Sequence, residues 1–124
     1  MIRKSFRTLA YLIGATSISS NVLAQSSPPS WEASRDVYKV IGETAQYRII
    51  LGTWKPDQSD NPHSHTPGLV VYLSDCNLRN HRPGMAPDDY AVKAGDFRPI
   101  AGIGSHHVEN IGKTDCQLIH VEKK

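Results

Sequence analysis

The sequence predicts an all-β protein, and three observations support this. Short runs rich in valine, isoleucine, leucine and tyrosine recur along residues 35–124, and glycine and proline separate these runs at short intervals. No run after residue 36 repeats its apolar residues with the spacing of an ordinary amphipathic helix. Many short strands with regular turn signals are typical of an antiparallel sandwich or a small barrel.

The first 24 residues are predicted to be a cleaved secretory signal peptide rather than part of the fold. Arg3, Lys4 and Arg7 form a basic start, residues 9–18 are an apolar stretch, and residues 22–24 form a small-residue cleavage site. The apolar stretch is too short and too interrupted for a convincing transmembrane span. We therefore expect an exported protein, either periplasmic or secreted, with no membrane anchor in its mature form.

The mature chain is expected to be one small domain without a basic surface. The signal peptide holds three basic residues and no acidic one, so its removal lowers Lys+Arg from 14 to 11 against 12 Asp+Glu, and the net charge from +2 to −1. No basic stripe remains that would favour nucleic acid as a partner. Residues 25–34 are rich in serine and proline and are predicted to be a flexible lead into a domain over residues 35–124.

Strands are predicted along the whole domain. Residues 37–41 and 47–54 are rich in β-branched and aromatic residues, and a polar connection then leads to His63. Turn residues become more frequent afterwards, with turns predicted at residues 75–77 and 83–84. The remaining predicted strands are 69–73, 90–92, 108–111 and 117–121, and the run 97–103 is interrupted by Pro99, Gly102 and Gly104.

Two histidines one residue apart, His63 and His65, are the main candidates for a functional site. On an extended backbone, alternate side chains project to the same face, so the two imidazoles would lie side by side as metal ligands do. The segment 105–110, which contains His106, is the obvious donor of a third ligand. A polar loop with two solvated histidines is the plain alternative, because the His-x-His pattern is common.

The two cysteines, Cys76 and Cys116, indicate a disulfide. An even cysteine count in a small exported domain favours a structural bridge, since the compartment is oxidising. Free thiols or soft metal ligands are the alternatives that the cysteine count leaves open.

The spacing of the histidines resembles that of the cupins, a family of small jelly-roll barrels. The family's first motif is G-x5-H-x-H-x3,4-E-x6-G, and His63 and His65 occupy its two histidine positions. The second motif is G-x5-P-x-G-x2-H-x3-N, and Gly95, His106 and Asn110 occupy its first glycine, its histidine and its asparagine without a gap. The resemblance implies a cupin-like antiparallel jelly-roll barrel.

Several positions depart from the family pattern. Asp57 stands at the first glycine of the first motif, and Leu69 or Val70 stands at its glutamate. Ala101 and Ile103 occupy the proline and the second glycine of the second motif. The usual carboxylate ligand is therefore missing.

The resemblance implies a three-histidine site at His63, His65 and His106 for a divalent transition metal, either Fe, Mn, Zn, Ni or Cu. Without the carboxylate, a loaded site carries one more positive charge, which favours a small anionic ligand. Loss of the metal, with the barrel binding a small molecule directly, is the alternative.

The family pattern also suggests roles for residues outside the ligand set. Asn110 occupies a motif position near the site, and Tyr72 could add a phenol to the cavity, although core packing is its more ordinary role. In a jelly roll, the strand after the first motif lies antiparallel to the last strand, which would bring Cys76 towards Cys116. Many small cupins pair, so a homodimer is also expected.

The remaining histidines are expected to lie outside the ligand set. Alternation sends His107 and Glu109 to the face opposite His106, which argues against Glu109 as the replacement carboxylate. His81 is interpreted as a solvated strand residue. His120 is interpreted as a satisfied structural histidine of the last strand, with a position lining the barrel as the alternative.

Three functions remain open from the sequence. The first is a metal-dependent enzyme, such as an oxygenase acting on a small anionic molecule. The second is a non-catalytic module that binds a small molecule or a metal. The third is a blue-copper protein, because Cys116-x3-His120 near the end of a small exported β-protein resembles that ligand loop.

Overall fold

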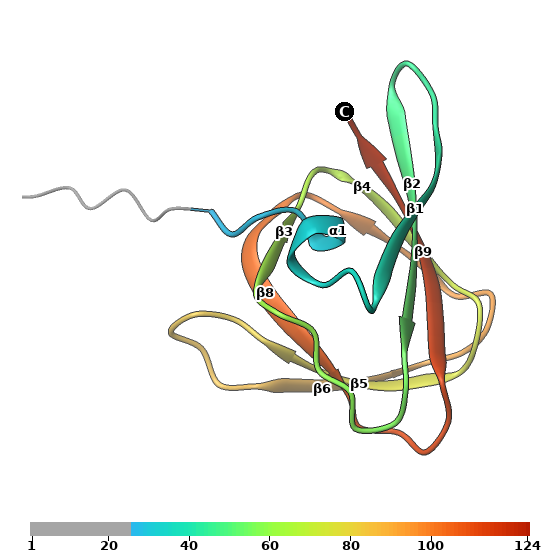
Figure 1. Ribbon diagram of the computed structural model, residues 1–124. Helices are drawn as coiled ribbons and strands as arrows, with labels where there is room; N and C mark the ends of the chain where they lie inside the picture. Colours follow the sequence, from blue (N-terminus) through green and yellow to red (C-terminus); the bar gives the residue numbers. More distant parts are fainter. Residues whose placement is uncertain (1–25) are drawn as a thin grey trace, which may run out of the picture.

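The structure is a computed structural model that describes residues 26–124, so the predicted signal peptide lies outside the described residues (Figure 1). Within them the chain forms nine strands and one four-residue helix, which confirms the predicted all-β class. The elements are α1 (Ser30–Ala33), β1 (Tyr38–Glu43), β2 (Tyr47–Trp54), β3 (His63–His65), β4 (Gly68–Tyr72), β5 (Cys76–His81), β6 (Asp88–Val92), β7 (Phe97–Ile100), β8 (Ile103–Asn110) and β9 (Cys116–Lys123).

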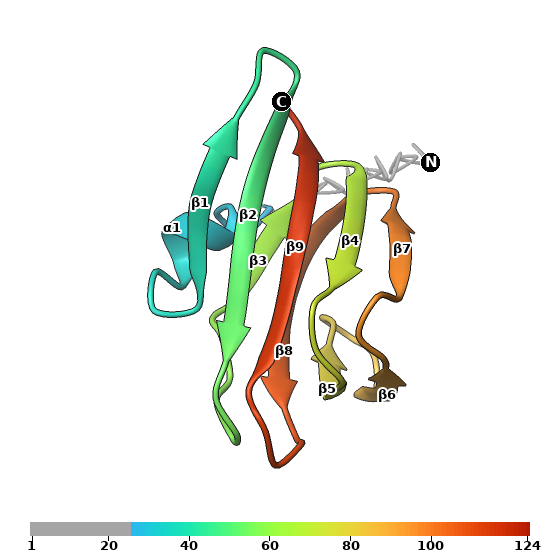
Figure 2. The same ribbon diagram turned by 90° about the vertical axis from the view of Figure 1, so that its right-hand side faces the viewer.

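The strands form two antiparallel sheets that enclose the core. One sheet has the order β1-β2-β9-β4-β7, and these five strands lie side by side in Figure 2. The other has the order β3-β8-β5-β6 and lies behind it. Burial of apolar side chains between the sheets is the main stabilising contribution; the core residues are Val37, Tyr38, Ile50, Trp54, Val70, Tyr72, Cys76, Leu78, Val92, Val108, Cys116 and Leu118.

The turn predicted at residues 75–77 is shorter than expected, because Cys76 already begins β5. The polar composition of this strand hides it in the sequence. Leu78 and Asn80 point inward and are buried, whereas Asn77 and Arg79 alternate with them on the outer side. A strand with one solvent-exposed face carries polar residues at every second position.

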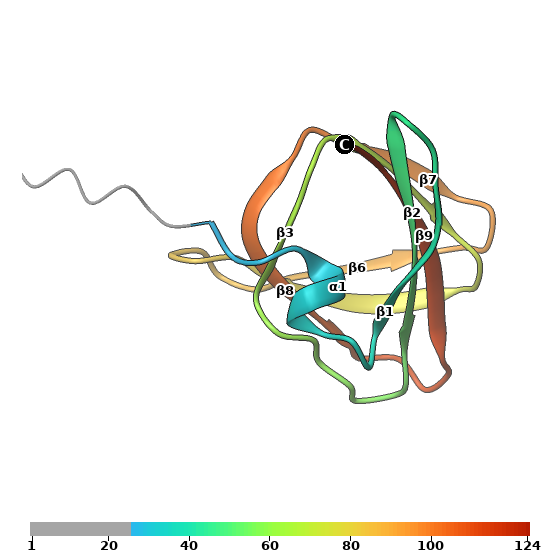
Figure 3. The same cartoon turned by 45° about the horizontal axis from the view of Figure 1, so that its top comes forward.

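Residues 26–34 do not form the loose lead that their composition suggests. The amide of Ser27 donates a hydrogen bond of 3.0 Å to the carbonyl of Gly104, and Pro29 forms a parallel bridge with Ser64. Ser30 is fully buried, and Trp31 packs against the core under the guanidinium of Arg48, 4.2 Å from the ring centre. The short helix α1 therefore lies between β1 and β3 at one end of the barrel (Figure 3).

The predicted disulfide between Cys76 and Cys116 is present. Their Cα atoms are 5.2 Å apart, and the bond joins the first residue of β5 to the first residue of β9. Because β5 and β9 belong to different sheets, the bridge ties the two sheets together at one end.

No helix in residues 26–124 is long and apolar enough to cross a membrane.

Candidate metal centre

The three predicted histidines meet inside the barrel. His63 and His65 alternate with the half-buried Ser64 on β3, and His63 lies opposite His106 of β8 in the strand pairing. All three are buried, and their ring centres lie between 4.5 and 5.1 Å apart. Alternation on two neighbouring strands therefore brings the predicted ligand set together.

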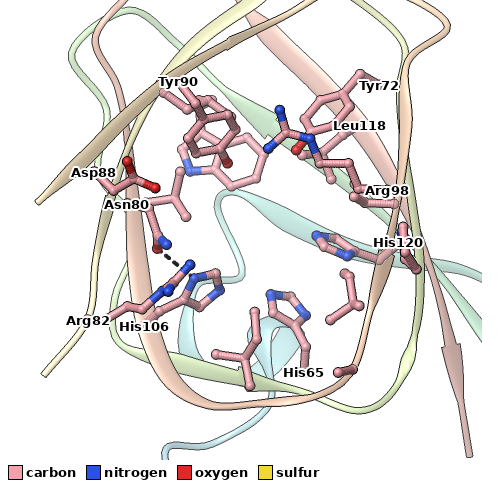
Figure 4. Close-up of a pocket in the computed structure, with 18 of the residues that line it drawn as sticks. His65, Tyr72, Asn80, Arg82, Asp88, Tyr90, Arg98, His106, Leu118 and His120 are labelled. Atoms are coloured by element: carbon pink, nitrogen blue, oxygen red, sulfur yellow. Dashed lines mark hydrogen bonds between the residues drawn. The ribbon is translucent and has the colours of Figure 1, made fainter. Parts of the chain in front are cut away.

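Each of these histidines has an oxygen acceptor at Nδ1. His63 Nδ1 donates to the carbonyl of Asn61 at 2.8 Å. His106 Nδ1 donates to Oδ1 of Asn80 at 2.8 Å, and Figure 4 marks this bond. The third donor, His65 Nδ1, lies 2.5 Å from Oε1 of Glu122. Acceptors at Nδ1 fix the proton there and leave the lone pair on Nε2, which is the arrangement around metal-bound histidines.

The three Nε2 atoms converge, and with the protons fixed at Nδ1 none of them carries a proton that could form a hydrogen bond to its neighbour. His63 Nε2 and His65 Nε2 are 2.9 Å apart, and His106 Nε2 is buried with no hydrogen-bond partner among the described residues. Converging lone pairs repel one another unless a cation lies between them. One ligand atom from each histidine falls within 4.8 Å of the others, so the cluster fits a transition metal that accepts imidazole ligands.

Burial keeps His63 and His106 neutral. It lowers the pKa of His63 to about 4 and that of His106 to about 2, and the charge of the neighbouring histidines adds to both effects. A neutral imidazole is the form that binds metal. Both side chains are therefore ready to coordinate at neutral pH.

Acidification is expected to destabilise the chelator-treated protein. His63, His106 and His120 have folded pKa values below the 6.5 of a free histidine, so the unfolded chain takes up protons first as the pH falls below 6.5. Burial raises the pKa of Asp60 to about 7. This opposes the trend, because below pH 7 the folded state holds a proton on Asp60 that the unfolded chain does not hold. Urea unfolding between pH 7 and pH 5 should show a loss of about 1 to 3 kcal/mol per pH unit. His120→Gln should flatten the slope, and a stability that rises on acidification would contradict this account.

A buried carboxylate that the sequence reasoning missed supports the site. Glu122 is 1% exposed and reaches His65 from β9, 57 residues away in the chain. His120, on the same inward face of β9, stacks on His65 with ring centres 4.3 Å apart, and its buried Nδ1 has no partner among the described residues. His120 therefore borders the site instead of being a satisfied structural histidine. The alternation of β9 was the signal that both side chains face inward.

Tyr38 and Asp60 form a second buried contact with the cluster. The Tyr38 hydroxyl donates to Oδ2 of Asp60 at 2.9 Å and lies 3.2 Å from Nε2 of His63. Asp60 Oδ1 accepts from the amide of Val108 at 2.6 Å, so the carboxyl is fixed on both sides. Burial, followed by the nearby Asp60, raises the pKa of Tyr38. A polar oxygen therefore stands beside the cluster although the motif glutamate is absent.

A cavity of about 270 Å³ opens beside the histidines (Figure 4). His65, His106 and His120 point into it, and Tyr72 lines it, as the sequence interpretation allowed. Its wall is otherwise mostly apolar, and its polar residues include Asn80, Arg82, Asp88, Tyr90 and Arg98. An apolar cavity with a few convergent polar groups is the usual form of a small-molecule site.

The structure contradicts two expectations from the sequence. Asn110 does not line the cavity: its side-chain amide donates to the carbonyls of Trp54 and Thr114, and its Oδ1 accepts from Gly112, in the connection between β8 and β9. The blue-copper interpretation is wrong, because the sulfur of Cys116 is bonded to Cys76 and is not available as a thiolate ligand.

The comparisons with known proteins identify the fold. No protein-family model and no curated protein matches the sequence. A cupin domain from Bordetella pertussis Tohama I superposes with a TM-score of 0.66 at 16% identity, over 79% of this chain and 96% of that one. A protein with a double-stranded β-helix domain from Klebsiella pneumoniae gives 0.55 at 19% identity, over 70% and 75%. KdgF from Halomonas sp. gives 0.50 at 12% identity, over 69% and 77%. The described part of the chain therefore has the jelly-roll fold of the cupin domains.

Proposed function

We propose that this cupin domain holds one divalent transition metal on His63, His65 and His106 and uses it to bind and transform a small organic anion. The observation that carries the proposal is the convergence of three Nε2 atoms whose rings are each fixed through Nδ1. A metal held in this way would supply Lewis acidity or, with iron or copper, activation of O2. The chain's own side chains hold the metal and shape the cavity beside it.

The charge around the cavity favours an anion. Arg82 and Arg98 both line it, and neither forms an ion pair with a carboxylate in the described part of the chain. Asp88 is the acidic residue of the wall. The Arg98 guanidinium lies over the ring of Tyr90, 5.0 Å from its centre, which directs its planar fork along the cavity. A carboxylate is the anion that this fork matches best.

The proposed location is outside the cytoplasm. The sequence predicts a signal peptide, and the bond between Cys76 and Cys116 is of the kind that persists in oxidising compartments. A non-catalytic protein that captures an anion through the same metal is the second candidate. It would bind the same ligands without turnover.

Arg98→Gln is expected to weaken carboxylate binding at least about tenfold, because a charge-assisted hydrogen bond is lost. Thermal shift of the metal-loaded protein with a panel of small mono- and dicarboxylates, each paired with its neutral amide, measures this. Arg79→Gln is the matched control, since Arg79 pairs with Asp89 on the outer surface. Equal stabilisation by acids and amides, or an equal loss in both variants, would count against an anionic ligand. Product analysis in the same samples separates the enzyme from the binding protein.

A further inference from the structure

A second pair of histidines lies on the outer face of the four-stranded sheet. His81 of β5 and His107 of β8 are directly opposite each other in the strand pairing. Their rings are stacked with centres 4.3 Å apart and planes only 6° from parallel. Because the preceding residues, Asn80 and His106, point inward, this pair faces away from the barrel interior.

Other metal-binding groups surround the pair. Oε2 of Glu109, the next outward residue on β8, lies 3.5 Å from Nε2 of His81. Met85 and both histidines line one surface hollow, which His106 of the inner cluster also borders. Met85 is 62% exposed, so packing against the core does not account for its position. Arg82 also lines the hollow and is its one basic side chain. The hollow thus combines two imidazoles with a thioether and lies beside a carboxylate.

This combination of donors is selective for copper. Imidazole suits Cu(II), and thioether sulfur selects Cu(I), whereas hard cations prefer oxygen-rich sites. Two imidazoles on adjacent strands also bind one ion as a chelate, since both side chains are already held side by side by the backbone pairing. The nitrogen lone pairs lie in the planes of the two stacked rings, so the side chains must rotate into other rotamers to direct both at one ion, and their positions on the outer face leave them free to do so.

We propose that His81 and His107 chelate a copper ion on the outer face of the barrel, with Glu109 assisting Cu(II) and Met85 assisting Cu(I). The outer site differs from the inner three-histidine cluster in its ligands, because neighbouring residues of β8, His106 and His107, point to opposite faces of the sheet. It does not depend on the proposed function of the inner site.

The test is copper titration of the full mature protein and three variants. The outer variant carries His81→Asn and His107→Asn, the inner variant carries His106→Ala, and a third carries Met85→Leu. We expect two Cu(II) ions per chain in the wild type and one in the outer variant. Each single outer substitution should weaken the outer site at least about tenfold, and nearly as much as the double one, because a chelate needs both nitrogens. Met85→Leu should weaken Cu(I) binding in ascorbate and leave Cu(II) binding unchanged.

The outcomes distinguish the outer site from the inner one. An outer variant that binds as many copper ions as the wild type, with unchanged affinity, would overturn the proposal. So would single substitutions that each cost only about twofold, because the histidines would then act independently. If the wild type binds one ion and the outer variant none, the outer site stands and the proposed inner site fails. Circular dichroism confirms that each variant is folded.

Discussion

Replacing His106 with alanine is expected to weaken divalent metal binding at the inner site by more than about 100-fold. Loss of a partner that only orients a ligand already costs roughly 10- to 100-fold, and His106 is proposed as a ligand itself. Cobalt(II) is a suitable probe, because its visible absorption reports the coordination of the bound ion. Titration of the chelator-treated protein, followed by visible absorption, measures the change.

Two variants provide the controls for this result. Glu122→Gln keeps the size of the side chain but removes the charge facing His65, so it should cost about 10- to 100-fold rather than abolish binding. His81→Asn, on the outer face, should leave the absorption of the inner site unchanged. Equal affinity in the wild type and in His106→Ala would show that the metal is not held by the cluster.

Removal of the disulfide is expected to lower the free energy of unfolding by about 4 kcal/mol. The bridge closes a loop with a sequence separation of 40 residues. The chain-entropy model assigns about 4 kcal/mol to a loop of this length, which is a large share of the stability of a domain this small. The double substitution Cys76→Ser and Cys116→Ser is preferred, because it leaves no unpaired thiol. Urea unfolding under non-oxidising conditions measures the change.

Reduction of the wild-type protein provides the internal control for the disulfide. Dithiothreitol should lower the stability of the wild type towards that of the double variant and leave the double variant unaffected. A loss below about 1 kcal/mol in both experiments would mean that the bridge contributes little, and that contacts between the sheets hold this end of the barrel without it.

The histidine cluster could be predicted because its signal is local. His63 and His65 are two residues apart on one strand, so alternation alone places both on the same face. The spacing of the second cupin motif then identified His106, and the structure pairs it with His63. The fold class was accessible for a similar reason, since turns and short apolar runs are read over a few residues.

The supporting groups could not be predicted, because their contacts join distant parts of the chain. Glu122 reaches His65 across 57 residues, and Tyr38 reaches Asp60 across 22. The periodicity of β9 indicates that Glu122 faces inward, but not which side chain it meets. Asn110 was misplaced by its motif position: it is four residues beyond His106 on an extended strand, roughly 13 Å away, and it bonds to the connection at the end of β8.

Residues 26–34, which lead into the domain, show that amino-acid composition alone does not predict whether a segment is ordered. Serine and proline in residues 26–34 suggested a loose segment, because such residues bury little apolar surface. Backbone hydrogen bonds and one aromatic side chain, Trp31, hold it against the barrel instead. Composition does not reveal whether the backbone groups of a polar segment have partners nearby.

The most direct test of the metal site is a crystal structure of the protein loaded with zinc or cobalt, in which anomalous scattering locates the ion. We expect one strong peak inside the barrel, from an ion bonded to Nε2 of His63, His65 and His106 at about 2.0 to 2.2 Å. A fully loaded crystal with no peak at these three atoms, or with metal only on the outer face, would contradict it.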